Sequence, residues 1–416
     1  MAPAARVLYL DHCARMSGGE IALARLVDAI PDLEAEVILG EDGPVKGLLE
    51  KAGAKVTVLP LDETARDLRR ASIVPSLALV PVLVQTIRYT LRIAREIRRR
   101  SPDLVVTNSL KSALYGGFAA RLARVPVVWH MRDHVGRESL TAPAVLLVRL
   151  AARFLPCGVI ANSESTLASL RIEKYARAGA ERARRRGPSD DERERARKAP
   201  AFAVIGDPCP LAPVTMEERK GGPLTVAMVG RLCPWKGQHL FLEAFARSFA
   251  AGDERAVIVG GALFGEQEYA SALEEQVRSL GLCGRVDLVG HVDDVSPYYE
   301  RADVLVHAST APEPFGQVLV EAMGHGNVVL AARAGGPTEI LTHGVDGLLY
   351  TPGDVDELSR ALHLVASDEE LRVRLGSSAR KSAVRFTPAR IGPRTKAAYY
   401  DMIRRARQDA VSKVPA

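Results

Sequence analysis

The chain has 416 residues, of which 47% are hydrophobic and 25% are charged. This composition is typical of a soluble globular protein and excludes a disordered, collagen-like or coiled-coil chain, and the length predicts two or three domains. The net charge is +6, but the stretch Arg171–Lys198 alone holds eleven Lys/Arg and six Asp/Glu, a net of +5. The charge therefore gives no reason to assign a partner to the rest of the chain.

The cysteines and the N-terminus favour a cytoplasmic protein. The five cysteines are scattered and contain no CxxC pair, which excludes a disulfide framework and a zinc site of the usual spacing. The first residues lead into a strand pattern and do not resemble a signal peptide. The most apolar window, Ile73–Ile87, is too short to span a bilayer.

The first half of the chain alternates short apolar runs with helical patterns. The runs that predict buried strands are Val7–Leu10, Glu36–Leu39, Lys55–Leu59, Leu104–Thr107, Val125–His130 and Gly158–Ala161. The patterns that predict helices are Glu20–Ala29, Gly47–Ala52, Thr86–Arg99 and Ala113–Ala123. This alternation predicts a parallel sheet with right-handed crossovers.

Arg171–Lys198 interrupts the pattern and has almost no large apolar residue after Tyr175. We interpret it as a solvated, charged insertion. The alternative is a basic module that binds RNA or a membrane. Because no aromatic residue follows Tyr175 in this stretch, base stacking is poorly supported, and we expect no nucleic-acid partner.

A second alternating series follows the insertion. Its predicted strands are Leu224–Val229, Ala256–Val259, Val286–Val289, Val304–His307, Val328–Ala332 and Gly347–Tyr350, and its predicted helices are Gln238–Ser248, Glu266–Leu280, Gln317–Met323, Val355–Ala366 and Arg394–Arg407. The sequence therefore predicts an α/β protein of two doubly wound, Rossmann-like domains that face a central cleft. Ligands of such folds bind outside the carboxyl ends of the strands.

Two segments of the second half carry candidate chemistry. Glu313 and Glu321 are eight residues apart, which predicts that Glu321 lies about two helical turns below the loop carboxylate. Carboxylates beside a helix N-terminus suit sugar hydroxyls, while the amides around Phe315, Gly316, Gln317 and Val318 suit a phosphate. After a turn at Gly230, Arg231 and Lys236 form a candidate clamp for a diphosphate.

These segments resemble the glycosyltransferase family 4 signature. Pro312–Met323, Ala334–Ile340 and Gly344–Leu348 carry the resemblance, with Glu313 and Glu321 as the E-x7-E motif. It is strong from Val226 to Pro352 and looser before Ala161. It implies the GT-B fold and a retaining hexosyltransferase that uses a nucleotide-sugar donor and no cofactor, with Glu313 on the donor sugar and Glu321 on the ribose.

The resemblance also implies roles for other residues and for the domains. Gly18 and Gly19 match the family's Gly-Gly loop, His130 matches a histidine that faces the sugar, and the backbone at His291 and Val292 matches the position that meets the nucleobase. Residues 1–205 with the C-terminal helix 391–416 are expected to bind the acceptor, and residues 206–390 to bind the donor. Asn108 and Asp133 are the candidate acceptor contacts, while Glu313, His130, Arg231 and Lys236 are the candidate catalytic residues.

Several alternatives stay open. A GT-B sugar-nucleotide epimerase and a sugar-polymer synthase share the fold. Asp293 and Asp294 are adjacent and do not form the spaced DxD motif that a metal-dependent transferase carries on a loop after a strand, so we expect no metal requirement. The nucleotide is UDP, GDP, ADP or TDP, and the acceptor is an envelope glycan, a lipid-linked sugar or a small natural product. Pro81–Arg100 and Pro143–Arg153 combine apolar and basic residues, which fits either two packed helices or peripheral contact with the inner membrane face. The sequence does not give the oligomeric state.

Overall fold

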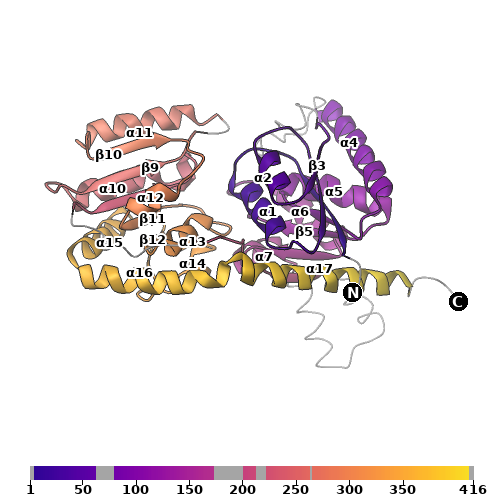
Figure 1. Cartoon of the computed structure of the whole chain (residues 1–416). Coiled ribbons are helices and arrows are strands. Elements are labelled where there is room, and N and C mark those ends of the chain that lie inside the picture. Colours follow the sequence, from indigo (N-terminus) through magenta and orange to yellow (C-terminus); the bar gives the residue numbers. More distant parts are fainter. Residues whose placement is uncertain (1–3, 62–78, 173–199, 212–221, 263–264, 412–416) are drawn as a thin grey trace, which may run out of the picture. The chain divides into compact units, whose positions relative to one another are not determined.

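The computed structural model describes residues 4–61, 79–172, 200–211, 222–262 and 265–411. Nearly all of the charged insertion Arg171–Lys198, and the loop from residue 62 to Pro75, lie outside these ranges. The chain divides into two compact units, which Figure 1 colours along the sequence. Unit 1 comprises Met1–Pro208 and Pro388–Ala416, and unit 2 comprises Cys209–Thr387.

Unit 1 contains a seven-stranded parallel sheet with the strand order β3-β2-β1-β4-β5-β6-β7. The strands are β1 (Arg6–Asp11), β2 (Glu34–Leu39), β3 (Lys55–Val58), β4 (Leu104–Thr107), β5 (Val127–Met131), β6 (Gly158–Ala161) and β7 (Ala201–Val204). The order reverses between β1 and β4, which is the topological switch point of a doubly wound fold.

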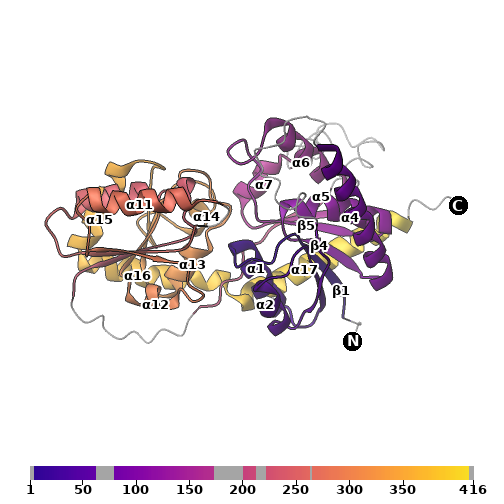
Figure 2. The ribbon, with the colours of Figure 1, turned by 90° about the horizontal axis from the view of Figure 1, so that it is seen from above.

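Helices cover both faces of this sheet. The helices α4 (Leu79–Arg100), α5 (Leu110–Ala123), α6 (Ala142–Phe154) and α7 (Glu164–Leu170) share one apolar core with the sheet. The helices α1 (Gly18–Asp28), α2 (Val45–Lys51) and the long C-terminal α17 (Pro388–Val411) share the core on the other face. Figure 2 shows α4, α5 and α6 together on one side of β4, with α1 and α2 on the other.

Unit 2 repeats the same topology with six parallel strands in the order β10-β9-β8-β11-β12-β13. The strands are β8 (Thr225–Val229), β9 (Arg255–Val259), β10 (Val286–Gly290), β11 (Val304–His307), β12 (Val328–Ala332) and β13 (Leu348–Tyr350). The elements around the sheet are η1 (Pro234–Lys236), α10 (Gln238–Ser248), α11 (Gln267–Ser279), α12 (Ser296–Arg301), α13 (Gln317–Gly324), α14 (Pro337–Ile340), α15 (Val355–Ser367), α16 (Glu369–Ala383) and η2 (Val384–Phe386). The order reverses between β8 and β11.

The prediction of two Rossmann-like sheets is therefore confirmed, and every predicted strand is present with ends shifted by at most two residues. The sequence reading missed β7, because this edge strand is only partly buried and follows the charged stretch. It also missed α16, whose fifteen residues are mostly charged or small and bury only a narrow stripe. Among the described helices, none is long and apolar enough to cross a membrane.

Candidate functional site

The candidate donor site lies at the switch point of the second sheet. The loop after β8 carries Arg231 and Lys236, and the loop after β11 carries Glu313. Because β8 and β11 are parallel neighbours, both loops leave the same edge of the sheet. The structure brings Lys236 and Glu313 into direct contact across this point.

Glu313 is buried, and its Oε2 atom has three polar neighbours. It accepts hydrogen bonds from Lys236 Nζ at 2.6 Å and Ser309 Oγ at 3.1 Å, and it lies 3.0 Å from His307 Nε2. Burial opposes the negative charge, but the Lys236 ammonium and His307 more than offset it and hold the pKa of Glu313 well below its usual range. The Glu313 carboxylate is therefore ionised at neutral pH.

Close backbone packing holds Lys236 in place. Gly237 follows it with φ +77°, and a Cβ atom at Gly237 would lie 2.1 Å from the carbonyl oxygen of Ala308. The Thr310 amide donates a hydrogen bond of 2.8 Å to the Trp235 carbonyl oxygen. These contacts fix η1 against the loop after β11, so Lys236 is set beside Glu313 by the backbone.

A glycine pair supports the Glu313 loop from behind. Gly336 N donates a hydrogen bond of 2.8 Å to the Glu313 carbonyl oxygen. Gly335 has φ +73°, and a Cβ atom there would lie 2.3 Å from the same oxygen. Both glycines belong to Ala334–Ile340, one of the segments that carry the family resemblance. The backbone of this segment therefore shapes the Glu313 loop.

Glu321 lies closer to the helix start than the spacing suggested. Gly316 adopts φ +105° as the N-cap, so α13 begins only at Gln317 and Glu321 is its fifth residue. The prediction of two helical turns between Glu313 and Glu321 is therefore wrong, because half of that spacing is loop. Glu321 Oε2 accepts a hydrogen bond of 3.0 Å from the Tyr299 hydroxyl.

The N-terminus of α13 offers amides for an anion. Phe315 is buried and packs edge-on against the ring of Phe386, with centroids 5.4 Å apart. This anchor and the glycine cap orient the amides that precede and begin α13, including those of Gln317 and Val318. Such a helix start can accept a phosphate.

Arg231 follows the end of β8 and forms an ion pair with Glu266. Its Nε atom lies 3.7 Å from Glu266 Oε2, and burial raises the pKa of Glu266 while Arg231 lowers it. Gly230 has φ +153°, and a Cβ atom at Gly260 would lie 2.0 Å from the Gly230 carbonyl oxygen. The two strand ends therefore approach too closely for a side chain at Gly260.

His291 follows β10 and is exposed, while Val292 is half-buried. A Cβ atom at Gly261 would meet the His291 Cβ atom at 3.1 Å, and Gly260 N donates a hydrogen bond of 2.8 Å to the Gly290 carbonyl oxygen. The carboxyl ends of β9 and β10 thus present mainly backbone next to the Arg231 loop.

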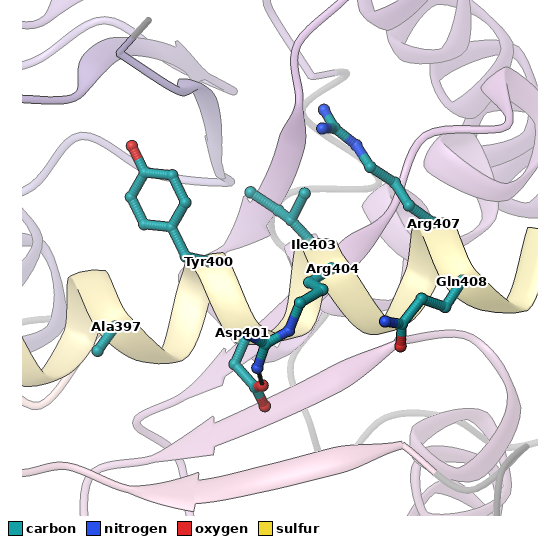
Figure 3. Close-up of a pocket in the computed structure, with 7 residues that line it drawn as sticks. All are labelled: Ala397, Tyr400, Asp401, Ile403, Arg404, Arg407 and Gln408. Carbon is teal, nitrogen blue, oxygen red and sulfur yellow. Dashed lines mark hydrogen bonds and ion pairs between the residues drawn. The ribbon is translucent and has the colours of Figure 1, made fainter. Parts of the chain in front are cut away.

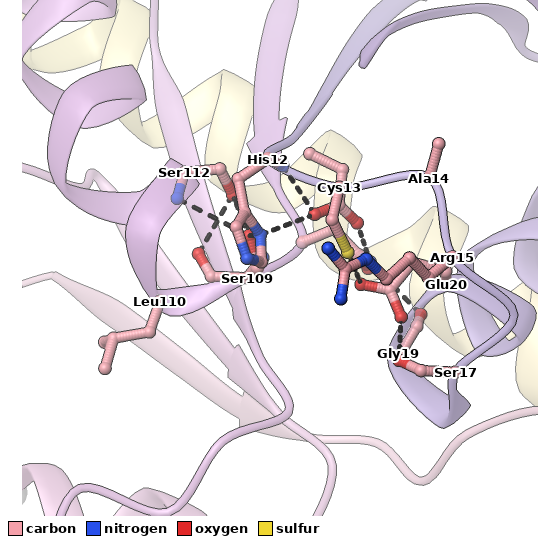
Figure 4. Close-up of polar contacts among 12 residues, drawn as sticks. His12, Cys13, Ala14, Arg15, Ser17, Gly19, Glu20, Ser109, Leu110 and Ser112 are labelled. Atoms are coloured by element: carbon pink, nitrogen blue, oxygen red, sulfur yellow. Dashed lines mark hydrogen bonds and ion pairs between the residues drawn. The ribbon is translucent and has the colours of Figure 1, made fainter. Parts of the chain in front are cut away.

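Unit 1 has a polar cluster at its own switch point (Figure 4). Asp11, His12, Cys13 and Glu20 offer ligand atoms within 4.8 Å of one another, a spacing at which they could hold a metal ion. Cys13 Sγ donates to Glu20 Oε1 at 3.0 Å, and Ser17 Oγ also contacts the Glu20 carboxylate. Burial raises the pKa values of the Cys13 thiol and the Glu20 carboxyl, and the negative charge of Asp11 adds to both shifts.

Asn108 connects this cluster to the Gly-Gly loop. Its Nδ2 atom donates to Asp11 Oδ2 at 2.6 Å and to the Gly19 carbonyl oxygen at 3.1 Å. Its Oδ1 atom accepts a hydrogen bond from Arg132. Gly18 is the first residue of α1. The amide of Asn108 is thus used within unit 1, and its acceptor-binding role stays a prediction.

The hydrogen-bonded side chains continue from Asn108 along the sheet edge to a buried ion pair between Arg132 and Asp207. Arg132 Nε donates to Asp207 Oδ1 at 2.9 Å, and Asn162 Nδ2 donates to Asp207 Oδ2 at 3.3 Å. Together with Asn108 and Asp11, these side chains follow the ends of five adjacent strands, β1 and β4 to β7. Sequence reasoning missed both Asp11, which ends β1, and Asp207, which lies three residues after the unpredicted strand β7.

His130 and Asp133 flank Arg132. His130 is buried within β5, and neither ring nitrogen has a hydrogen-bond partner among the described residues. Burial, with help from the Arg132 charge, lowers the pKa of His130 well below its usual value. Asp133 Oδ2 accepts from the Leu110 amide at 3.3 Å. The roles of His130 and Asp133 toward ligands stay predictions.

A hollow of about 480 Å³ lies elsewhere, along α17 (Figure 3). Its lining residues are Ala397, Tyr400, Asp401, Ile403, Arg404, Arg407 and Gln408. None of these is a predicted site residue.

Two family models match the sequence. Residues 45–177 match the model described as Glycosyltransferase Family 4, and residues 216–382 match the model described as Glycosyl transferases group 1. The two matched regions lie in unit 1 and unit 2, respectively. The second region contains Arg231, Lys236, Glu313 and Glu321.

Curated relatives match part of the chain. It is 32% identical over 159 residues to the lipopolysaccharide core biosynthesis glycosyltransferase LpsE of Rhizobium meliloti, which covers 38% of this chain and 44% of LpsE. It is 30% identical over 182 residues to the D-inositol 3-phosphate glycosyltransferase of Corynebacterium glutamicum, which covers 43% of each. The match therefore spans less than half the length of these relatives.

Solved structures match over nearly the whole chain. HepE of Anabaena, in complex with UDP and glucose, has a TM-score of 0.78 at 28% identity over 95% of this chain and 100% of HepE. Sucrose-phosphate synthase of Thermosynechococcus elongatus has a TM-score of 0.72 at 19% identity over 96% of this chain and 99% of the synthase. At 19% identity, the similarity to sucrose-phosphate synthase shows a shared fold alone.

Proposed function

Because this chain belongs to glycosyltransferase family 4 and has the GT-B fold, we propose that it is a retaining hexosyltransferase that uses a nucleotide-sugar donor and a hydroxyl acceptor. One observation supports this most directly: the ionised Glu313 carboxylate stands beside the Lys236 ammonium, 2.6 Å away, at the switch point of the second sheet. A fixed carboxylate binds sugar hydroxyls, and an adjacent cation binds phosphate.

Unit 2 is the proposed donor-binding unit. Lys236 and Arg231 contact the diphosphate, and the backbone amides around Phe315–Val318 donate hydrogen bonds to its outer phosphate at the start of α13. Glu321, which already accepts a hydrogen bond from the Tyr299 hydroxyl, accepts hydrogen bonds from the ribose hydroxyls. UDP is the first nucleotide to test, because the similar HepE structure contains UDP.

The proposed reaction breaks the bond between the anomeric carbon and the diphosphate oxygen and forms a bond to the acceptor oxygen on the same face. The acceptor proton passes to the departing phosphate. Lys236 and Arg231 stabilise the negative charge that develops on the leaving group, which is the task that a metal performs in other transferases. Glu313 holds the sugar hydroxyls so that the anomeric carbon is presented to the acceptor.

Unit 1 is the proposed acceptor-binding unit, with Asn108 and Asp133 as the candidate acceptor contacts. Gly18 and Gly19 are candidate donor contacts, and His130 is a candidate catalytic residue that faces the donor sugar. LpsE takes part in lipopolysaccharide core biosynthesis, as its name states. Among the acceptor classes open from the sequence, we therefore place an envelope glycan or its lipid-linked precursor first. We also propose that the protein is cytoplasmic.

The test begins with thermal shifts in UDP, GDP, ADP and TDP, with and without their sugars. Transfer to candidate acceptors follows, and NMR of the product gives the anomeric configuration. Glu313→Gln should reduce transfer at least about 100-fold, which is the cost of removing one preorganised polar group. Glu370→Gln, an exposed carboxylate on α16, is the matched control. Normal transfer by Glu313→Gln would contradict the proposal, as would an inverted product or an epimer formed from donor alone.

A further inference from the structure

Four side chains with metal-binding atoms meet where β1 ends and α1 begins (Figure 4). Asp11 is the last residue of β1, His12 and Cys13 follow it, and Glu20 lies in the first turn of α1. Their ligand atoms all lie within 4.8 Å of one another. None of the four has a role in the proposed binding of donor or acceptor.

Two contacts in this cluster have nearly the separation of two donor atoms on one metal ion. His12 Nδ1 lies 3.3 Å from Asp11 Oδ1, and Cys13 Sγ lies 3.0 Å from Glu20 Oε1. Zinc bonds of about 2.0–2.3 Å in a tetrahedral site place neighbouring donor atoms about 3.3–3.8 Å apart. Small movements of these side chains are therefore enough to seat an ion among the four atoms.

The second oxygen of each carboxylate is held by a neighbouring side chain. Asp11 Oδ2 accepts a hydrogen bond of 2.6 Å from Asn108 Nδ2, and Glu20 Oε2 accepts one from Ser17 Oγ. Metal-binding side chains are commonly oriented by such outer hydrogen bonds. Asp11 Oδ1 and Glu20 Oε1 are thus the two carboxylate oxygens turned toward the cluster.

The imidazole of His12 can turn to a metal without leaving a polar group unsatisfied. Its Nδ1 atom lies 2.8 Å from Ser109 Oγ. That hydroxyl also lies 3.0 Å from Ser112 Oγ. When an ion takes His12 Nδ1, Ser109 therefore keeps a hydrogen-bond partner.

The two carboxylates are buried without a basic partner. Asp11 is 1% exposed and Glu20 is 5% exposed. Among the described residues, neither forms an ion pair with a lysine or an arginine, and Asp11 contacts only the ring of His12. Buried charges in proteins are either paired or bound to metal ions. A divalent cation would supply the positive charge that this cluster lacks.

The backbone of the cluster is fixed by the end of β2. Gly40 N donates a hydrogen bond of 2.9 Å to the Asp11 carbonyl oxygen, and Val45 N donates one of 3.1 Å to the Ala14 carbonyl oxygen. A Cβ atom at Gly40 would lie 2.6 Å from the His12 carbonyl oxygen. The ligands on this segment are therefore positioned before any ion binds.

The kinds of donor atom select the metal. Magnesium and calcium take sites built from oxygen atoms, whereas this cluster supplies one sulfur and one imidazole nitrogen besides its two carboxylates. Zinc accepts all three kinds of ligand and is commonly bound by four of them. The spacing along the chain is not that of a cysteine-pair zinc motif, so the sequence alone gave no sign of the site.

We infer that Asp11, His12, Cys13 and Glu20 bind a zinc ion, which ties the end of β1 to the first turn of α1. A zinc–sulfur bond forms, the S–H bond of Cys13 breaks, and its proton passes to the buffer. The ion would hold the loop that contains Gly18 in one conformation. The inference does not rest on the proposed function, because the cations proposed to stabilise the leaving group belong to unit 2.

The experiment titrates the full chain, freed of metal by a chelator, with Zn²⁺ and with Co²⁺ as a spectroscopic probe. After dialysis, metal analysis should find one zinc ion retained per chain. Calorimetry in buffers of different ionisation enthalpy should show that zinc binding releases at least one proton. Co²⁺ should give a thiolate-to-cobalt charge-transfer band in the near ultraviolet, which reports on a cysteine ligand directly.

Variants assign the ligands. Cys13→Ser should abolish the charge-transfer band. His12→Ala and Glu20→Gln should each weaken zinc binding at least about 100-fold, whereas Ser17→Ala, which removes an outer hydrogen bond, should weaken it about 10-fold.

Matched controls change the same residue types elsewhere. Cys283→Ser removes an exposed thiol, and His134→Ala removes a histidine whose Nδ1 atom lies 2.6 Å from Glu138 Oε1. Both should bind zinc and cobalt like the wild type.

Three results would overturn the inference: less than one zinc ion retained per wild-type chain, a wild-type cobalt spectrum without the thiolate band, or a band that survives Cys13→Ser or disappears in Cys283→Ser. The cluster would then serve only as a hydrogen-bonded support for the loop before α1. The first two results come from the wild type, so they decide the matter even where a variant fails to fold.

Discussion

Lys236 Nζ lies 2.6 Å from Glu313 Oε2, so the cation proposed to bind a diphosphate and the carboxylate proposed to bind a sugar neutralise each other. Both side chains are mostly removed from solvent, and neither charge would be tolerated there alone. His307 and Ser309 contact the same carboxylate oxygen. In the proposed donor complex, a phosphate would therefore share Lys236 with Glu313, while His307 and Ser309 keep the carboxylate in position.

The first prediction concerns this ion pair. Lys236→Ala leaves Glu313 buried without its main counter-charge, and we expect a loss of about 3–5 kcal/mol in the free energy of unfolding of unit 2. Binding of UDP should also weaken, as calorimetry would measure. Lys236→Arg should recover most of the stability because the charge is kept. Lys381→Ala, at an exposed position on α16, is the control, and equal stability of the two alanine variants would contradict the prediction.

The second prediction assigns His307 as a positioning residue for Glu313. His307→Leu removes the 3.0 Å contact to Glu313 Oε2, so the pKa of Glu313 should rise. We expect kcat to fall about 10-fold or more with little change in KM for the donor, because Lys236 and Arg231 still bind the diphosphate. The acid limb of the kcat–pH profile should move to higher pH, whereas a purely structural loss would leave it in place.

Much of this arrangement could be predicted from local sequence. Alternation of apolar runs and helical patterns was sufficient for every described strand except the partly buried edge strand β7, since these strands are short and apolar. Glu313, Lys236 and Arg231 were recognisable because their motifs are contiguous. His307 was predicted only as the end of a strand, because nothing in the sequence indicates that its ring turns toward a residue six positions later.

Contacts between distant segments were not predictable. Asp11, Asn108, Arg132 and Asp207 span nearly 200 residues and meet only because four strands end at one edge. The exposed apolar stripe of α5 was likewise hidden, since apolar residues four apart fit a buried helix equally well, and for the same reason the sequence left Pro143–Arg153 of α6 open between a packed helix and membrane contact. Only the fold shows which side of each helix is left without a partner.

The third prediction tests the backbone approach that places Lys236. Gly237→Ala requires a side chain at φ +77° and puts Cβ 2.1 Å from the Ala308 carbonyl oxygen. We expect a loss of at least about 2 kcal/mol in unfolding free energy, with weaker UDP binding, because the loops must separate. Gly353→Ala is the matched control: its φ is +82° but its Cβ would meet nothing within 4 Å. That variant should lose only about 1 kcal/mol. An equal loss in both variants would show that glycine is required at 237 only for its positive φ, and not for the close approach to Ala308.

The fourth prediction concerns His130. Burial lowers its pKa well below the ordinary value, so the folded protein keeps the ring neutral while the unfolded chain protonates it near pH 6.5. Below that pH the unfolded state binds a proton that the folded state does not, and stability should therefore fall by about 1.4 kcal/mol per pH unit as the pH decreases. Urea unfolding in a Trp235→Phe background, in which Trp129 beside His130 reports on unit 1, measures this slope. The unfolding free energy of the wild type minus that of His130→Leu should be constant above pH 7.5 and should decrease below pH 6.5. His363→Leu, which changes an exposed histidine on α15, should follow the wild type at every pH. A difference that stays constant down to pH 5 would mean that His130 is protonated in the folded state as readily as in the unfolded chain.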